Sequence, residues 1–300
     1  MKRIFLSILT LLALVALPAV AEGRLEVVAA NFPCYDFARQ VVGDRGEVSL
    51  LIKPGVEVHA YEPTPADIVA IGKADLFVYI GGEGDAWADN ILSGFDGGKG
   101  PAALRMMDAV TPLEEEGDND AHDIPEYDEH IWTSPKNAMA MVRSLSDALC
   151  GLDAANADAY RAAAEGYIGQ IGELDAAFRE VVASGARREL VFADRFPFLY
   201  FTREYGLDYL AAFPSCTADT EPTPQILMKL IQRVAQDDIP AVYAIELSTQ
   251  AVARTVAEET GAEILTLHSM QTVTQQEFDA GETYVSLMTR NLEAVRRGLN

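Results

Sequence analysis

The feature that most constrains this chain is an alternation of strand-like and helix-like segments, which occurs twice. In the first half, apolar runs at 25–30, 48–52 and 76–80 are separated by segments with helical periodicity. The run 76–80 is apolar throughout, as expected for a strand that is buried on both faces. Strands that alternate with helices in this way favour a parallel sheet covered by helices on both sides. We therefore predict an α/β fold.

The second half repeats this pattern of elements, although the sequence itself shows no repeat. We expect strands at 189–193, 209–213, 241–245 and 264–267, and helices at 198–205, 224–236, 251–260 and 284–299. Between the two halves, residues 154–183 have one long helical pattern. A helix of about thirty residues would be about 45 Å long, more than a small domain needs, so we predict that it connects two lobes. The predicted division is 22–153, 154–184 and 185–300.

The first 21 residues have the pattern of a signal peptide. Lys2 and Arg3 precede the apolar run 4–17, and a small-residue cleavage site ends at Ala21. The run is too short for a comfortable membrane span. No cysteine lies at the cleavage point, so we expect a soluble periplasmic protein that is exported without a lipid anchor.

The charge of the chain limits its partners. It has 46 acidic and 23 basic residues, for a net charge of −23, and such a chain repels nucleic acid and anionic lipid. We therefore expect no nucleic-acid partner. The stretch 114–129 is strongly acidic and includes His122. It is interpreted either as a solvated linker or as a mobile, weak collector of cations.

Three cysteines are present, Cys34, Cys150 and Cys216, and none belongs to a CxxC pair. An odd number in an exported protein leaves at least one thiol unpaired. One disulfide is compatible with the sequence, but the sequence does not say which.

Three of the four histidines occupy similar places in the predicted fold. His59 follows the run 48–52 and a turn, His130 closes the acidic stretch, and His268 ends the run 264–267. Residues that follow buried parallel strands lie at the carboxyl edge of the sheet, where α/β proteins bind ligands. Since imidazole is a common metal ligand, metal binding is the first hypothesis.

The segments around two of these histidines resemble a known family. The marks are G-V-x-x-H-x-Y-E-P-T-P-x-D at 55–67, D-x-H-I-W-x-S-P at 128–135, Tyr200-Phe201 with R-E-Y-G-L at 203–207, and Y-V-S-L-M at 284–288. Together they are similar to the ZnuA/TroA-type solute-binding proteins of ABC importers for zinc and manganese. The resemblance covers almost all of the chain beyond the predicted signal peptide. It implies two α/β lobes joined by one long helix, with the metal between the lobes.

The resemblance also implies a set of metal ligands. His59 and His130 match two histidines of the first lobe, and the fourth position, normally an acid after the last strand, is His268 here. The third position is occupied by Arg195, which cannot bind a metal, and its neighbour Asp194 is the replacement that we predict. The predicted ligands are therefore His59, His130, His268 and Asp194.

The fourth donor has alternatives. Cys216, Glu246 or a water molecule could also be this donor. Cys216 is more easily explained as a small buried residue than as a ligand. Glu246 is more easily explained as a partner that orients an imidazole. Arg195 is expected to form an ion pair with Asp194 or Glu246.

Three imidazoles and one further donor favour Zn²⁺, with Mn²⁺ as the alternative. We expect a monomer that captures the ion as cargo and delivers it to a membrane permease, and that is not an enzyme. A zinc hydrolase is the alternative from another class. It would need a general base beside a metal-bound water, and the sequence has no HExxH motif.

Overall fold

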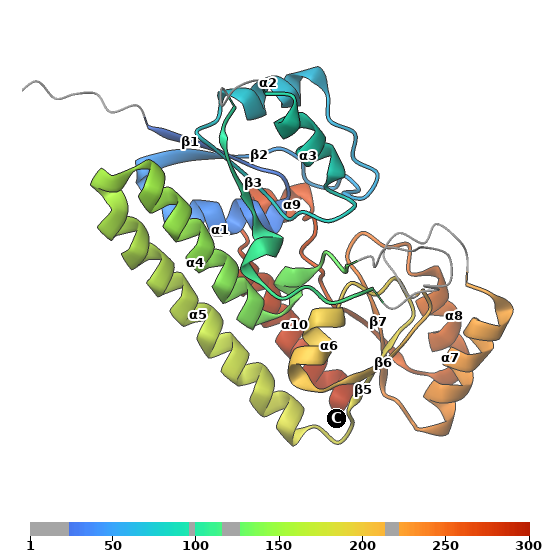
Figure 1. The fold of residues 1–300 in the computed structure, drawn as a ribbon. Coiled ribbons are helices and arrows are strands. Elements are labelled where there is room, and N and C mark those ends of the chain that lie inside the picture. The colour runs from blue at the N-terminus through green and yellow to red at the C-terminus, as the bar shows by residue number, and fades with distance from the viewer. Residues whose placement is uncertain (1–23, 96–99, 116–126, 214–221) are drawn as a thin grey trace, which may run out of the picture.

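The computed structural model describes residues 24–95, 100–115, 127–213 and 222–300 (Figure 1). The predicted signal peptide lies outside the described residues, and so do His122 and Cys216. Within the described ranges, no helix is long and apolar enough to cross a membrane. Cys34 and Cys150 are not bonded to each other.

The first lobe contains one parallel sheet, with the strand order β2-β1-β3-β4. Its strands are β1 (Leu25–Ala29), β2 (Gly46–Leu50), β3 (Leu76–Tyr79) and β4 (Ala102–Arg105), and its helices are α1 (Phe32–Val42), α2 (Pro65–Lys73) and α3 (Ala86–Ser93). Because consecutive parallel strands are joined by crossovers, every strand ends at the same edge of the sheet. The predicted α/β fold is confirmed.

Local sequence signals set the starts of the first helices. The side chain of Asn31 accepts a hydrogen bond from the Cys34 N–H at the start of α1. At α2, Thr64 and Asp67 form a reciprocal capping box, and Pro65 occupies the first turn. These caps fix the points where the chain turns from the carboxyl edge of the sheet back into a helix.

Two long helices follow the first sheet, α4 (Pro135–Leu152) and α5 (Ala157–Ser184). The predicted connecting helix is thus present with 28 residues, and the turn Ala154–Asn156 just before it is a 3₁₀ helix. Helix α5 runs along both lobes and packs against α4, α1 and α10 (Tyr284–Leu299) (Figure 1).

The second lobe has the same topology, with a parallel sheet in the order β6-β5-β7-β8. Its strands are β5 (Glu189–Phe192), β6 (Asp208–Ala211), β7 (Ala241–Ala244) and β8 (Glu263–Thr266), and its other helices are α6 (Leu199–Tyr205), α7 (Pro224–Gln236), α8 (Ala251–Thr260) and α9 (Gln275–Asp279). The order of elements that the sequence predicts to occur twice therefore corresponds to the same sheet topology in both lobes.

The hydrophobic core is continuous between the lobes. One cluster of buried side chains includes Val27 and Phe37 of the first lobe, Phe178 of α5, Phe192 of the second lobe and Leu287 of α10. Two smaller clusters cover the other face of each sheet. The shared cluster means that α5 and α10 belong to both lobes.

A buried carboxylate joins three of these helices. Asp36 of α1 is fully buried and accepts hydrogen bonds from the Tyr167 hydroxyl of α5 and the Tyr284 N–H of α10. Arg39 of α1 pairs with the same carboxylate at 2.8 Å. A buried charge is tolerated only when it is paired and hydrogen-bonded, and here the partners lie on three helices that are far apart in the sequence.

The sequence did not predict β4 or α9, and part of the acidic stretch is not solvated. Strand β4 is a short edge strand with partly exposed side chains, and α9 has only five residues, so both give weak patterns. At the end of the acidic stretch, Asp128 is buried. The interpretation of 114–129 as a solvated segment is therefore wrong at this end.

We expect Tyr167→Phe to lower the free energy of unfolding by about 2 kcal/mol, because it removes one hydrogen bond to a buried carboxylate. Urea unfolding followed by circular dichroism measures this change. Tyr160→Phe is the matched control on the same helix. Its hydroxyl donates to Asp153, which is not buried, so the loss should be about 1 kcal/mol or less. Equal losses would contradict a special role for Asp36.

Candidate metal centre

The candidate site is built from segments that follow the carboxyl ends of strands in both lobes. His59 lies in the connection after β2, and His130 lies in the connection after β4. Arg195 follows β5, and Gln271 follows β8. Ligands of α/β proteins bind at this edge of the sheet, so the position agrees with the prediction.

The structure brings His59 and His130 together. Their ring centroids are 5.5 Å apart, with 62° between the ring planes. His130 is only 4% exposed, and His59 is half-buried. The fold of the first lobe therefore brings together two of the predicted ligands, His59 and His130.

Asp128 holds the imidazole of His130. Its Oδ1 accepts the His130 N–H at 2.8 Å and lies 3.2 Å from the ring Nδ1. A carboxylate on one ring nitrogen fixes the orientation of the ring and raises the basicity of the other nitrogen. This role was not predicted, because Asp128 was interpreted as part of a solvated stretch. Its place two residues before His130 in the D-x-H-I-W-x-S-P segment was the available signal.

Gln271 reaches His59 from the second lobe. Its amide nitrogen lies 2.6 Å from the Nε2 of His59. Rotating the amide by half a turn places its oxygen there instead, and oxygen is a metal ligand. Gln271 was not predicted, because the imidazole of His268, three residues earlier, was the expected ligand after this strand. The available signal was its position, because a polar side chain shortly after the last strand can reach this edge of the sheet.

His268 has other partners. Its ring Nδ1 accepts the Met270 N–H at 2.9 Å, and its backbone N–H donates to the side-chain oxygen of Asn291. Nε2 lies 3.7 Å from a carboxylate oxygen of Glu277. Burial acts to lower the pKa of His268, but the carboxylates of Glu246 and Glu277 outweigh it and the pKa is raised. A raised pKa disfavours the neutral ring that a metal needs.

Asp194 is likewise held by the protein. One carboxylate oxygen accepts the Arg195 N–H at 2.9 Å, and the other accepts the Ile245 N–H at 3.4 Å. Across the described part of the chain, no three His, Cys, Asp or Glu side chains gather in a group that could hold a metal ion. The ligand set His59, His130, His268 and Asp194 therefore stays a prediction.

Arg195 forms an ion pair that links the lobes. A guanidinium nitrogen lies 3.2 Å from a carboxylate oxygen of Glu57, two residues before His59. Asp194, an expected partner, accepts the backbone N–H of Arg195. Glu246, the other expected partner, accepts hydrogen bonds from the N–H and hydroxyl of Ser269.

The imidazole of His59 is kept neutral. Burial lowers its pKa from the usual value of 6.5 to about 4, and the neighbouring His130 and Arg195 act in the same direction. Glu57 and Asp128 oppose this shift but do not cancel it. His59 is therefore ready to donate a lone pair at neutral pH without first losing a proton.

Two carboxyl groups of the first lobe are largely buried, Glu129 directly before His130 and Asp85 in the turn after β3. Burial raises the pKa of Glu129 to about 7 and that of Asp85 to about 6. The glycines at 82 and 84 leave room for the Glu129 carboxylate, which a Cβ at either position would meet. A cation bound at the adjacent His130 would favour the ionised form of Glu129.

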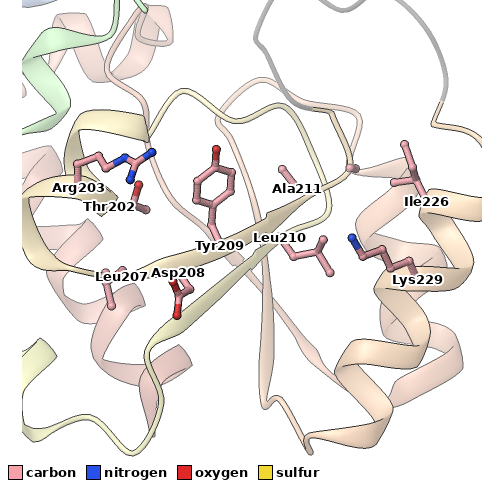
Figure 2. Close-up of a pocket in the computed structure, with 10 residues that line it drawn as sticks. Thr202, Arg203, Leu207, Asp208, Tyr209, Leu210, Ala211, Ile226 and Lys229 are labelled. Atoms are coloured by element: carbon pink, nitrogen blue, oxygen red, sulfur yellow. The ribbon is translucent and has the colours of Figure 1, made fainter. Parts of the chain in front are cut away.

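A separate cavity of about 580 Å³ lies along the edge strand β6 (Figure 2). Arg203 and Tyr209 line one side, and Ile226 and Lys229 of α7 line the other. None of the predicted ligands lines it, so we do not assign the metal site to this cavity.

Comparison with known proteins places the chain in a family. The model of the family ZnuA, "Zinc-uptake complex component A periplasmic", matches residues 27–298. This chain belongs to that family. The match includes both lobes and the connecting helix.

Related proteins and solved structures agree with this assignment. The zinc-binding lipoprotein AdcA of Streptococcus pneumoniae is 31% identical over 99% of this chain, but the chain spans only 61% of that protein. The high-affinity zinc uptake system protein ZnuA of Bacillus subtilis is 31% identical, over 92% of this chain and 88% of that protein.

Among solved structures, the Zn(II)-bound ZnuA-like domain of S. pneumoniae AdcA has a TM-score of 0.78 at 29% identity. That alignment covers 92% of this chain and 99% of the other. The metal-dependent lipoprotein YcdH of B. subtilis gives a TM-score of 0.79 at 29% identity, covering 92% and 100%. The family therefore shares the two-lobed fold described above.

The lowered pKa of His59 predicts how the metal-free protein responds to acid. Between about pH 6.5 and 4 the unfolded chain binds a proton at His59 that the folded chain does not, so stability falls as the pH falls. We compare wild type with His59→Gln by urea unfolding. The stability of wild type relative to the variant should fall by about 1–2 kcal/mol between pH 7 and pH 5.

The raised pKa of His268 has the opposite effect, but it is present in both proteins and cancels in the difference. A difference that does not change with pH would mean that His59 titrates normally in the folded protein.

Proposed function

We propose that this protein binds Zn²⁺ between its two lobes and delivers the ion to the membrane permease of an ABC importer. The observation that carries the proposal is the pair His59–His130, with rings 5.5 Å apart at the carboxyl edge of the first sheet. The family match and the zinc proteins among the relatives support the same conclusion.

His59 and His130 are the two ligands that the proposal requires. Neutral imidazole is a preferred ligand of Zn²⁺, and the depressed pKa of His59 keeps that ring neutral. The Asp128 carboxylate beside His130 is a common partner of metal-bound histidine. We propose the amide oxygen of Gln271 as a third donor, because it needs only a rotation of the amide.

Nitrogen donors favour Zn²⁺ over Mn²⁺, which prefers carboxylate and other oxygen ligands. His268 and Asp194 would have to leave their present hydrogen bonds to reach an ion at His59. They remain candidates, and the titration below tests them beside Gln271.

The arrangement of the ligands suggests how the ion is used. The two histidines belong to the first lobe, and Gln271 belongs to the second. An ion bound by both would fix the orientation of the lobes, which the permease would recognise. The shared core along α5 and α10 supports small rather than large motions of the lobes.

The direct test is competition of Zn²⁺ and Mn²⁺ against a chelator of known affinity, with the purified mature protein. His59→Ala and His130→Ala should each weaken Zn²⁺ binding more than about a hundredfold, the upper limit for residues that only support a ligand. Gln271→Ala, His268→Ala and Asp194→Ala then show which of the three also bind the ion.

A variant with unchanged affinity is not a ligand. Tighter binding of Mn²⁺ than of Zn²⁺ would overturn the choice of metal, and no binding of either would overturn the function.

The transport role is tested in cells. We propose that the chain is exported, which the pattern of residues 1–21 and the family's description as periplasmic support. We also propose that it acts as a monomer. A strain without this protein should grow poorly when zinc is depleted and normally when manganese is depleted. Wild type should restore growth and the double variant His59→Ala/His130→Ala should not. Normal growth of the deletion strain without zinc would argue against delivery.

A further inference from the structure

The turn that follows β8 carries two polar side chains of the second lobe in different directions. His268 begins this turn and Gln271 ends it, and the amide of Gln271 lies 2.6 Å from the His59 ring. Met270, between them, is fully buried and has a φ of 62°, a left-handed conformation that residues other than glycine rarely adopt. Such a conformation persists only when surrounding groups hold it.

The ring of His268 is one of these groups. Its Nδ1 accepts the Met270 N–H at 2.9 Å. A backbone N–H can only donate, so Nδ1 uses its lone pair in this bond and the neutral ring carries its proton on Nε2, which lies 3.7 Å from the Glu277 carboxylate. In this tautomer neither ring nitrogen has a lone pair to give to a metal ion. To bind a metal, His268 would have to release the Met270 N–H or lose the proton on Nε2.

Other side chains hold the backbone of the same turn. Asn291 of α10 accepts the His268 N–H at 2.7 Å and donates to the His268 carbonyl at 2.8 Å. Glu246 accepts the Ser269 N–H at 2.7 Å, and the Gln271 N–H donates to the Ser269 hydroxyl at 3.2 Å. The protein itself therefore sets the direction in which Gln271 leaves the turn.

One further contact connects the turn to the first lobe. The indole of Trp132, two residues after His130, donates to the Ser269 carbonyl at 2.7 Å. The segment with His130 and the turn with Gln271 therefore hold each other in place across the junction of the lobes. Metal affinity depends on ligands that are already in position, so a group that fixes this turn also affects the site.

We propose that His268 is a positioning residue of the metal site. Its ring holds the Met270 N–H, and the resulting turn presents the amide of Gln271 to the ion at His59. This role rests on the proposed function, because it requires Gln271 and His59 to share one ion. His268 would then support a ligand, whereas the sequence predicts that it is one.

The Zn²⁺ affinity of the mature protein, measured by chelator competition, separates the two roles. His268→Ala should weaken binding about ten- to a hundredfold, the usual effect of losing a residue that supports a ligand. His268→Asn should bind Zn²⁺ like wild type, because an asparagine side chain readily accepts the backbone N–H two residues on. His268→Gln places its oxygen nearer to the position of Nε2 and should bind as weakly as His268→Ala. A ligand that binds through Nε2 would give the reverse order, with His268→Gln above His268→Asn.

A double-mutant cycle shows whether His268 acts through Gln271. Gln271→Ala should weaken Zn²⁺ binding. Adding His268→Ala to this variant should cause no further loss, because the turn then has no ligand to present. Two independent ligands would instead give losses that add.

Ser248→Ala is the matched control. The Ser248 hydroxyl accepts the Gln250 N–H at 3.0 Å, and Gln250 has a left-handed φ of 56° in the connection after the neighbouring strand β7. This variant removes the same kind of contact, but the residue that it holds leads into α8. It should bind Zn²⁺ like wild type.

A measurement on wild type needs no substitution, so it does not depend on the folding of the variants. Long-range ¹H–¹⁵N NMR spectra report which nitrogen of each imidazole carries a proton or a metal. When Zn²⁺ is added, the ring nitrogens of His59 and His130 should shift. Those of His268 should keep the pattern of a proton on Nε2.

Four results would show that His268 does not have this role. They are a metal-bound pattern of the His268 nitrogens, additive losses in the cycle, an unchanged affinity of Gln271→Ala, and an equal loss in His268→Asn and His268→Ala. In each of these cases the proposed zinc function stands, because wild type still binds the ion. No Zn²⁺ binding by wild type would overturn both.

Discussion

The buried carboxylate of Asp36 is the interaction on which the arrangement of the two lobes depends. It lies on the first helix, and it accepts hydrogen bonds from the connecting helix and from the start of the last helix. A buried charge demands these partners, so α1, α5 and α10 cannot shift independently without leaving it unsatisfied. The continuous hydrophobic core around Phe37 and Phe178 also holds these helices together, through non-directional packing.

Because the lobes are fixed in this way, the carboxyl edges of the two sheets face each other. The candidate site forms between these edges. The first sheet supplies His59 and His130, and the second supplies Gln271 and Arg195. Further contacts stabilise this junction. The Trp132 indole donates to the Ser269 carbonyl, and the Tyr200 hydroxyl donates to the Asp128 carbonyl, each across the lobes. The functional groups are therefore positioned by the same contacts that hold the lobes.

The sequence predicts the order and type of most elements because the signals are local. The apolar run of β3 and the helix predicted at 224–236 are confirmed at or close to their predicted bounds. Edge strand β4 was not predicted, because it is short and its side chains are partly exposed. In the site, His59 and His130 were predicted, but Gln271 was not, since nothing in its own surroundings distinguishes it from other polar residues after a strand. Asp128 belongs to the D-x-H-I-W-x-S-P segment, but its contact with the His130 ring is visible only in the structure.

The sequence by itself determined the α/β class, the long connecting helix and the two histidines of the first lobe, because periodicity, caps and motifs are properties of short segments. Only the tertiary structure decided which side chains of the second lobe face them. His268 and Gln271 are three residues apart after the same strand, yet one accepts a backbone N–H and the other contacts His59. That choice depends on the turn through Met270, whose φ is 62°, and on partners such as Asn291 that are distant in sequence.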